Sequence, residues 1–300
     1  MSKNYDSTGE YPIRVIRCIN CKTLNLWGKS SNFLAELYDY YKDGQTTSIE
    51  QLFDPLTQKS YKQVLSNLRD KVKGNRILDV GCGRGDFVYA ARGTGWIIEG
   101  IELSEAAVKS AQAHSLPVKL LDFFSDQLNQ NQYDVITFFE VIEHLPDVTS
   151  FLRRAEQLLT PGGIIYLTTP NHDSLDRRIL KDDWPVYHRE HLSYFTPNSL
   201  RNAVLSYTNL NIFSLITKNI SPLTLKLISK KITPGFIRDT LRTPVYNGPI
   251  EENLRTSIDK SVRLQYAKRA INFILNLADA GNTIECLLQK QVTGQFPDKH

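Results

Sequence analysis

The alternation of short apolar runs with helical segments between residues 76 and 169 is the feature that most constrains the fold. Strands are expected at Arg76–Val80, Trp96–Ile101, Pro117–Asp122, Tyr133–Glu140 and Gly163–Thr169. Helices are expected at Asp86–Arg92, from a capping Ser104 to about His114, and from Phe151 to Leu159 before Pro161-Gly162-Gly163. Strands that alternate with helices of this length build a parallel sheet covered by helices. The sequence therefore predicts an α/β fold with a doubly wound, mainly parallel sheet.

The segments that flank this core are less regular. A helix is expected near Tyr61–Val72, and Asn282–Lys290 reads as a closing strand. Apolar residues at helical spacing mark one face of a further helix at Val262, Tyr266, Ala270, Ile274 and Leu277. The predicted organisation is an N-terminal extension (1–58), a core domain (59–217) with an insertion at 170–196, a basic and helical cap (218–281) and a closing strand of the core sheet (282–292).

Length and composition indicate a globular chain. Three hundred residues, of which 41% are hydrophobic, are enough to bury a full core. The first dozen residues are polar and no apolar run of about 18 residues occurs, so neither a signal peptide nor a membrane-spanning helix is expected. Cys18, Cys21, Cys82 and Cys286 do not have the pattern of a disulfide framework. A reducing, cytoplasmic location is therefore predicted.

The net charge of +4 is unevenly distributed along the chain. Residues 1–200 carry 22 lysines and arginines against 25 acidic residues, whereas residues 201–300 carry 14 against 7. Such a basic segment suits phosphates, an anionic membrane surface, nucleic acid or simply solvent. No nucleic-acid partner is expected, because the basic third lacks the interleaved aromatic residues of a recognition module and no N/D-P-P-Y tetrad follows the fourth strand.

The stretch ILDVGCGRGD, at Ile77–Asp86, places closely spaced glycines between the first strand and a helix. This arrangement brings the backbone against a ligand at the helix N-terminus. The dinucleotide fingerprint G-x-G-x-x-G has its third glycine at the position of Asp86, whose carboxylate would repel a pyrophosphate. No G-x-x-x-x-G-K-[ST] occurs either, so the sequence disfavours NAD, FAD and a P-loop nucleotide.

The run D-V-G-C-G-R-G resembles the first motif of class I S-adenosylmethionine (SAM) methyltransferases, and the later motifs of that family follow in order. The resemblance covers about residues 60–216 and the closing strand. It implies a seven-stranded Rossmann-like sheet and SAM as the cofactor.

Carried over by position, the resemblance implies a set of cofactor contacts. Glu102, at the end of the second strand, matches the acid that accepts hydrogen bonds from both ribose hydroxyls. Asp122 matches the acid that receives the adenine amino group, with Phe123 beside the ring. Asp79 and Gly81 would approach the amino and carboxylate groups of SAM. The neighbouring positions that complete the expected set are Cys82, Gly83, Leu103 and, in the FFEVIEHLPD segment along the methionine end, Glu140. Taken alone, Glu102 and Asp122 are equally typical of acidic residues that only cap the start of a helix.

Three titratable residues are candidates for the methyl-acceptor site, namely His144, Glu190 and His191. In open α/β sheets the ligand lies beyond the carboxyl ends of the strands, and these residues follow the fourth and fifth strands. A base is useful there when the acceptor is a hydroxyl or a carbon acid, because a proton must leave. Each histidine also has a structural reading, as a residue that anchors a loop or a helix start.

Two family resemblances bear on the acceptor. The HREH and SYF runs at His188–Phe195 resemble the Y-x-E-H…Y segment of sugar-nucleotide C-methyltransferases, in which Tyr, Glu and His line the acceptor site. Glu190 and His191 match this pattern, whereas His188 stands in the place of the tyrosine. Glu143-His144 resembles the corresponding segment of ubiquinone-pathway O-methyltransferases. The reaction type therefore stays open.

Cys18 and Cys21 have the C-x-x-C spacing of a zinc half-site. The segment resembles the second knuckle of an N-terminal zinc ribbon in some sugar-pathway SAM methyltransferases, where an LY…Y helix follows, as at Leu37–Tyr41 here. A structural zinc needs four ligands, and the first knuckle is absent from this chain. We therefore expect no metal within the chain; zinc would need a second subunit.

The sequence thus predicts a SAM-dependent methyltransferase that acts on a small or carrier-linked acceptor such as a sugar. Two alternatives stay open: an O-methyltransferase for a quinone, phenol or lipid, and a non-catalytic SAM-binding subunit. The basic and apolar segment Leu223–Phe236 is expected to cap the acceptor site, to contact a membrane surface or to pack against the sheet.

Overall fold

The computed structural model describes residues 4–5, 12–27, 53–188, 190–222, 224–225 and 256–292. Two sequence predictions concern segments outside these residues, the helix expected at Leu37–Tyr41 and most of the segment Leu223–Phe236. The chain forms two compact units. The core unit comprises residues 30–168, 203–214 and 286–300, and the second unit comprises residues 1–29, 169–202 and 215–285.

The main sheet has seven strands in the order β11-β12-β9-β8-β5-β6-β7. Their bounds are β5 (Arg76–Val80), β6 (Ile97–Glu102), β7 (Val118–Leu120), β8 (Tyr133–Phe139), β9 (Leu159–Pro170), β11 (Asn211–Lys218) and β12 (Thr283–Gln289). The pairs β5–β6, β6–β7, β5–β8 and β8–β9 are parallel. The predicted α/β fold with a mainly parallel sheet is therefore confirmed, including the closing strand at residues 283–289.

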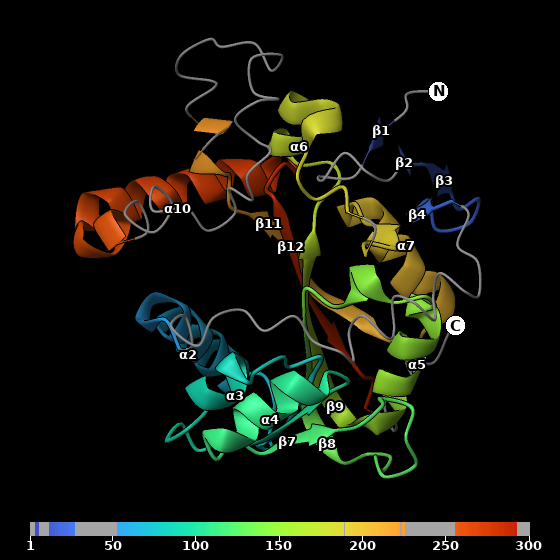
Figure 1. Ribbon diagram of the computed structural model, residues 1–300, viewed down its shortest axis with the longest axis vertical. Helices are drawn as coiled ribbons and strands as arrows, with labels where there is room; N and C mark the ends of the chain where they lie inside the picture. Colours follow the sequence, from blue (N-terminus) through green and yellow to red (C-terminus); the bar gives the residue numbers. More distant parts are fainter. Residues whose placement is uncertain are drawn as a thin grey trace, which may run out of the picture. The chain divides into compact units, whose positions relative to one another are not determined.

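In the core unit, helices α2 (Pro55–Arg69), α3 (Asp86–Ala90) and α4 (Glu105–Ala113) lie on one face of the strands, and α5 (Val148–Leu158) lies on the other (Figure 1). The first face buries a cluster drawn from both layers, including Leu65, Phe87, Ile77, Val135 and Ile164. Burying each side chain of this size stabilises the folded chain by on the order of 2 kcal/mol. Strand β5, which leads into the glycine turn, thus packs against α2 and α3.

Local capping explains where three of these helices begin. The side chain of Ser104 accepts a hydrogen bond from the backbone nitrogen of Ala107, which confirms the predicted start of α4. Asp147 caps α5, whose buried face consists of Leu152, Ala155 and Leu158. Asp54 caps α2. Helix α2 therefore begins six residues before the expected Tyr61. The expected start rested on apolar spacing, which does not reveal a polar capping residue.

Strand β9 begins at Leu159 rather than at the predicted Gly163. The register jumps between Tyr133–Leu159 and Val135–Ile164, so five residues of β9 oppose two of β8. Gly162 has a φ of +80° within this irregularity. The sequence Pro161-Gly162 therefore forms a bulge inside the strand instead of a loop before it.

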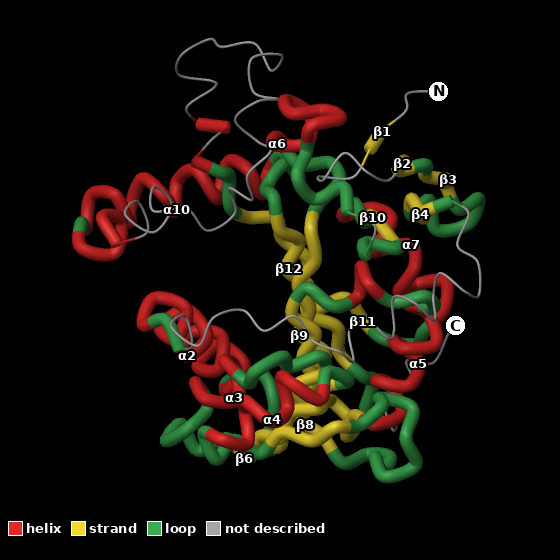
Figure 2. Tube along the Cα trace, in the orientation of Figure 1, coloured by secondary structure: helices red, strands yellow, loops and turns green. Residues whose placement is uncertain are grey.

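The second unit holds a small antiparallel sheet in the order β10-β4-β3 (Figure 2). Its strands are β3 (Val15–Arg17), β4 (Leu24–Leu26) and β10 (Ser193–Tyr194). Further elements of the chain are β1 (Asn4–Tyr5), β2 (Pro12–Ile13), η2 (Ile142–His144), α6 (Leu175–Leu180), η3 (Lys181–Asp183), α7 (Pro197–Tyr207) and α10 (Val262–Leu277). The predicted helix at residues 262–277 is confirmed.

Cys18 and Cys21 lie in the turn between β3 and β4. The backbone nitrogen of Cys18 donates to the carbonyl of Thr23 at 2.9 Å, and the thiol of Cys21 donates to the hydroxyl of Thr23 at 3.2 Å. The pKa of the Cys18 thiol is lowered by hydrogen bonds from backbone N–H groups, chiefly that of Cys21. None of the four cysteines forms a disulfide, and the expectation of no metal stays a prediction.

Candidate cofactor and acceptor site

The turn after β5 strongly favours glycine at position 81. Gly81 has a φ of +67°, and a Cβ added there would lie 2.9 Å from Cγ2 of Val141. The backbone nitrogens of Gly81 and Cys82 both donate to the carbonyl of Ile101, at 2.9 and 3.2 Å. The left-handed backbone and the close approach of a neighbouring side chain together explain the glycine.

The carboxylate of Glu102 fixes this turn from the end of β6. Its Oε2 accepts from the backbone nitrogen of Gly83 at 2.9 Å, and its Oε1 accepts from Leu103 and Ser104 at 2.7 and 2.9 Å. Ser104, and not Glu102, provides the side chain that caps α4. A carboxylate offers about four acceptor positions, so Glu102 keeps capacity for a ligand hydroxyl.

Asp79 is a buried carboxyl at the floor of the turn. Its side chain is 2% exposed, and Oδ1 accepts a 2.6 Å hydrogen bond from the hydroxyl of Thr137 on β8. Burial raises the pKa of Asp79 to about 7; the charge of Glu102 adds to the increase and the hydrogen bond from Thr137 opposes it. Because the charged form is costly here, a cationic ligand group would stabilise it.

A pocket of about 270 Å³ opens at the glycine turn. It is lined by Asp79, Gly81, Cys82, Gly83, Arg84, Asp86 and the aromatic residues Tyr61, Phe87 and Phe139. The ring of Tyr61 makes edge contacts with Phe87 and Phe139, at centroid distances of 5.3 and 5.1 Å. Burial raises the pKa of Tyr61, and the charges of Asp79, Asp86 and Glu140 act in the same direction. The pocket therefore favours positive charge.

Tyr61, Arg84, Asp86, Phe87 and Phe139 were not among the predicted site residues. Tyr61 lies on the same face of α2 as the buried Leu65 and Leu68, four and seven residues later. That spacing indicates a residue that faces the sheet, and it was the available signal for Tyr61.

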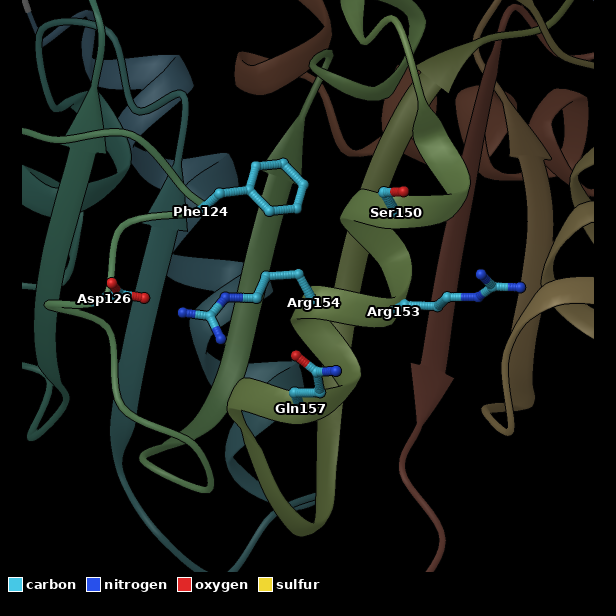
Figure 3. A pocket seen from close by; sticks show the side chains of 6 residues that line it. All are labelled: Phe124, Asp126, Ser150, Arg153, Arg154 and Gln157. Carbon is cyan, nitrogen blue, oxygen red and sulfur yellow. The ribbon is translucent and has the colours of Figure 1, made fainter.

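A second pocket, of about 340 Å³, lies between the loop after β7 and helix α5 (Figure 3). Its lining residues are Phe124, Asp126, Ser150, Arg153, Arg154 and Gln157. Both arginines donate to backbone carbonyls: Arg153 to Tyr207, and Arg154 to Ser125 and Leu128. These bonds give the arginines a structural role, so the smaller pocket at the glycine turn is the better cofactor site.

The other predicted cofactor residues are placed as follows. Asp122 follows β7, has an exposed side chain and accepts from the backbone nitrogen of Phe124 at 2.7 Å. Phe123 is 4% exposed and stacks on Phe151 with a centroid distance of 5.4 Å. Glu140, just after β8, is exposed and has a φ of +54°. The assignment of these residues to adenine and to the methionine end stays a prediction.

In the core unit, the candidate His144 ends the 3₁₀ helix η2, and its backbone nitrogen donates to the carbonyl of Val141 at 3.0 Å. Its neighbour Glu143 is 2% exposed. The segment that carries both residues directly follows β8, as the sequence predicted. A role for His144 toward an acceptor stays a prediction.

In the second unit, the candidate His191 is oriented by its backbone neighbours. Its Nδ1 lies 2.7 Å from the carbonyl oxygen of Val186. A carbonyl only accepts, so Nδ1 carries the proton and Nε2 carries the lone pair of the neutral ring. Glu190 Oε1 lies 3.7 Å from Nδ1 of His188, which places the predicted Glu190 beside His188. His191 thus has the tautomer that a base requires.

Buried aromatic residues surround this segment. Nε2 of His172 is 3.0 Å from the hydroxyl of Tyr187, and His172 and Tyr187 are 8% and 5% exposed. Trp184 and Tyr194 complete the cluster by edge contacts with the ring of Tyr187. Burial, together with the charge of Arg177, lowers the pKa of His172 to about 4. The ring of His172 is therefore neutral at physiological pH, and no local sequence pattern marked it as a buried residue of this cluster.

The sheet order, the glycine turn and the acid at the end of β6 define a class I SAM-dependent methyltransferase fold. A family model described as a methyltransferase domain matches residues 52–215, which is more than half of the chain. The chain belongs to this methyltransferase family, and SAM is its cofactor. A SAM-dependent methyltransferase from Archaeoglobus fulgidus has the same fold, with a TM-score of 0.51 and 17% identity, covering 78% of this chain and 94% of that one.

Two curated relatives match part of the chain. The ubiquinone biosynthesis O-methyltransferase of Leptothrix cholodnii is 37% identical over 111 residues, or 34% of this chain and 47% of that protein. The enzyme of the same name from Bordetella avium is 33% identical over 118 residues, or 36% and 48%. The chain therefore spans about half the length of the curated relatives it matches.

The residues at the glycine turn fit SAM. The cofactor carries a cationic ammonium and a cationic sulfonium, and the pocket is lined by Asp79 and Asp86. The ribose hydroxyls require an acceptor, which Glu102 offers beside the turn. Asp79, Gly81, Gly83 and Glu102 are accordingly the residues that would hold it.

Proposed function

We propose that this chain transfers a methyl group from SAM to an acceptor that loses a proton, either a hydroxyl or an acidic carbon of a small or carrier-linked molecule. The observation that carries the proposal is the electronegative pocket at the glycine turn, with the buried Asp79 and the braced Glu102. SAM supplies a methyl group bonded to a positively charged sulfur, which a nucleophile can displace. The protein then has to align the acceptor and to remove its proton.

His191 is the proposed base. Its proton on Nδ1 is held by the carbonyl of Val186, so Nε2 can accept the proton of the acceptor. Glu190, adjacent in sequence, is the carboxylate proposed to stabilise the resulting imidazolium. His144 is the second candidate for contact with the acceptor.

Two acceptor classes have separate support. The segment with Glu190 and His191 resembles that of sugar-nucleotide C-methyltransferases, which favours a sugar. The match to ubiquinone biosynthesis O-methyltransferases favours a phenolic hydroxyl of a quinone precursor. The sugar stays the first proposal, since the phenol rests on a match of about a third of the chain.

The test is methyl transfer from SAM labelled in the methyl group, offered with nucleotide-linked sugars in one series and with dihydroxy-aromatic acids in another. His191→Ala should lower turnover about 10²- to 10⁴-fold and leave SAM affinity within about twofold. His114→Ala, at the exposed histidine that follows α4 as its C-cap, is the matched control and should behave as the unmodified chain. Full turnover in His191→Ala would show that His191 is not the base. SAM binding without methyl transfer to either series would favour a non-catalytic SAM-binding subunit.

A further inference from the structure

Helix α10 (Val262–Leu277) turns polar side chains toward the protein. Oδ1 of Asn272 accepts from the backbone nitrogen of Asn219 at 2.9 Å, and Oδ1 of Asn276 accepts from Thr217 at 2.8 Å. These partners belong to β11 and the residue after it, so the bonds fix the rotation of the helix about its own axis. A helix that packs through an apolar stripe would place its asparagines on the opposite side.

The outer face of α10, defined as Val262, Tyr266, Phe273, Ile274 and Leu277, is apolar and exposed. Each of these side chains is between 63% and 72% exposed. Val262, Tyr266, Phe273 and Leu277 follow one another by four, seven and four residues, so they form one line along the helix. The sequence predicted an apolar face on this helix, but the structure directs it away from the protein. An exposed apolar stripe of this kind is typical of a surface that binds a protein, a membrane or a ligand.

The charges on α10 indicate what covers this face. The helix carries Arg263, Lys268 and Arg269 and contains no acidic residue. The guanidinium of Arg269 lies 5.7 Å from the ring centroid of Tyr266, next to the outer face. A second copy docked on the same face would bring these cations together, which is unfavourable. Anionic lipid headgroups would complement them, with the apolar side chains at the acyl boundary.

The dimensions agree with a helix that lies on a membrane. Sixteen residues extend about 24 Å, which is shorter than a membrane-spanning helix requires. Among the described residues, no helix is long and apolar enough to cross a bilayer. We propose that the outer face of α10 binds the surface of an anionic lipid bilayer, with Arg263 and Arg269 at the phosphates. This membrane contact is independent of the proposed methyl transfer.

Flotation of the full chain with vesicles tests this surface. Vesicles of phosphatidylcholine with about 30% phosphatidylglycerol should bind the chain at least tenfold more strongly than pure phosphatidylcholine, since each cation contributes about fivefold. The double variant Phe273→Gln and Leu277→Gln should lose at least tenfold in binding to the anionic vesicles. Leu205→Gln, at a leucine of α7 that is 61% exposed, is the matched control and should bind as the unmodified chain does.

A second variant, Arg263→Gln with Arg269→Gln, should remove most of the preference for anionic vesicles; it keeps the test decisive if the first variant fails to fold. Thermal unfolding followed by circular dichroism reports whether each variant is folded. No flotation of the unmodified chain, or equal flotation of the folded double variants, overturns the proposal. A dimer that is abolished by Phe273→Gln and Leu277→Gln, in a chain that does not float, would instead assign the face to a second copy.

Discussion

The hydroxyl of Thr137 donates a 2.6 Å hydrogen bond to Oδ1 of Asp79, its neighbour across the parallel strands β8 and β5. This bond holds a carboxyl that is 2% exposed and whose pKa is raised to about 7, chiefly by burial. Near neutral pH, Asp79 is therefore poised between its neutral and charged forms. A ligand with a cationic group would bind the charged form and release the proton, so proton release couples to cofactor binding.

SAM affinity is predicted to rise with pH in the range below the pKa of Asp79. Between about pH 5.5 and 7 the gain should approach tenfold per pH unit, and it should level off above about pH 8. Asp79→Asn cannot titrate, so its affinity should be weak and nearly independent of pH over this range. Calorimetric titration with SAM at several pH values, in buffers of different ionisation enthalpy, also counts the released protons. A SAM affinity that does not change with pH in the unmodified chain would show that Asp79 does not contact the cofactor.

Gly81→Ala is predicted to destabilise the chain by about 2–4 kcal/mol, because the new Cβ combines a strained φ with a collision against Val141. Gly93→Ala is the matched control: Gly93 has a φ of +73°, and an added Cβ would meet no atom within 4 Å. That variant should lose only about 1 kcal/mol and keep its SAM affinity. Urea unfolding and SAM titration of both variants compare the two effects. Equal losses in both would show that backbone strain alone accounts for the glycine.

Stability is predicted to fall in acid because of His172. Its folded pKa of about 4 lies below the unfolded value of about 6.5, so the unfolded chain binds more protons between these pH values. The contribution of His172 is therefore complete above about pH 6.5 and is lost as the pH falls toward 4, by at most about 3 kcal/mol. The hydroxyl of Tyr187 lies 3.0 Å from Nε2 of His172, and Arg177 donates to its backbone carbonyl, whereas the charge of Asp173 acts to raise the pKa of His172.

Urea unfolding at pH 7, 5.5 and 4.5 measures this effect, with His172→Gln as the variant that cannot titrate. The difference between the variant and the unmodified chain isolates His172, because Asp79 acts in the opposite direction: its raised pKa means that its contribution falls as the pH rises from about 4 to 7. A constant difference across the three pH values would contradict the lowered pKa of His172.

Local signals in the sequence predicted the core of the fold well. The apolar run Arg76–Val80 is β5 residue for residue, and Ser104 caps α4 as expected, because both signals act over a few residues. The glycine turn was predicted for the same reason. The bulge in β9 was missed, since Pro161-Gly162 marks a turn equally well between two elements and inside a strand.

Features that depend on contacts between distant residues could not be predicted in this way. Tyr61 reaches the pocket from α2 only because the helix packs on the sheet beside Phe87 and Phe139. Periodicity predicted the apolar face of α10, but the direction of that face is set by the bonds from Asn272 and Asn276 to β11 and the residue after it. Neither the buried state of His172 nor the tautomer of His191 has a sequence signal.

The most direct test of SAM binding at the glycine turn is the SAM affinity of a Glu102 variant. Its carboxylate accepts from three backbone nitrogens and is the proposed ribose acceptor, so Glu102→Ala should remove both functions. Calorimetric titration of the unmodified chain with SAM should give a saturable heat with one site per chain, and Glu102→Ala should weaken the affinity by at least tenfold, by analogy with other charged hydrogen bonds. Glu105→Ala, at an exposed glutamate three residues away, should leave the affinity unchanged. No heat with SAM or with its demethylated product, or the same affinity in Glu102→Ala, would contradict a cofactor site at this turn.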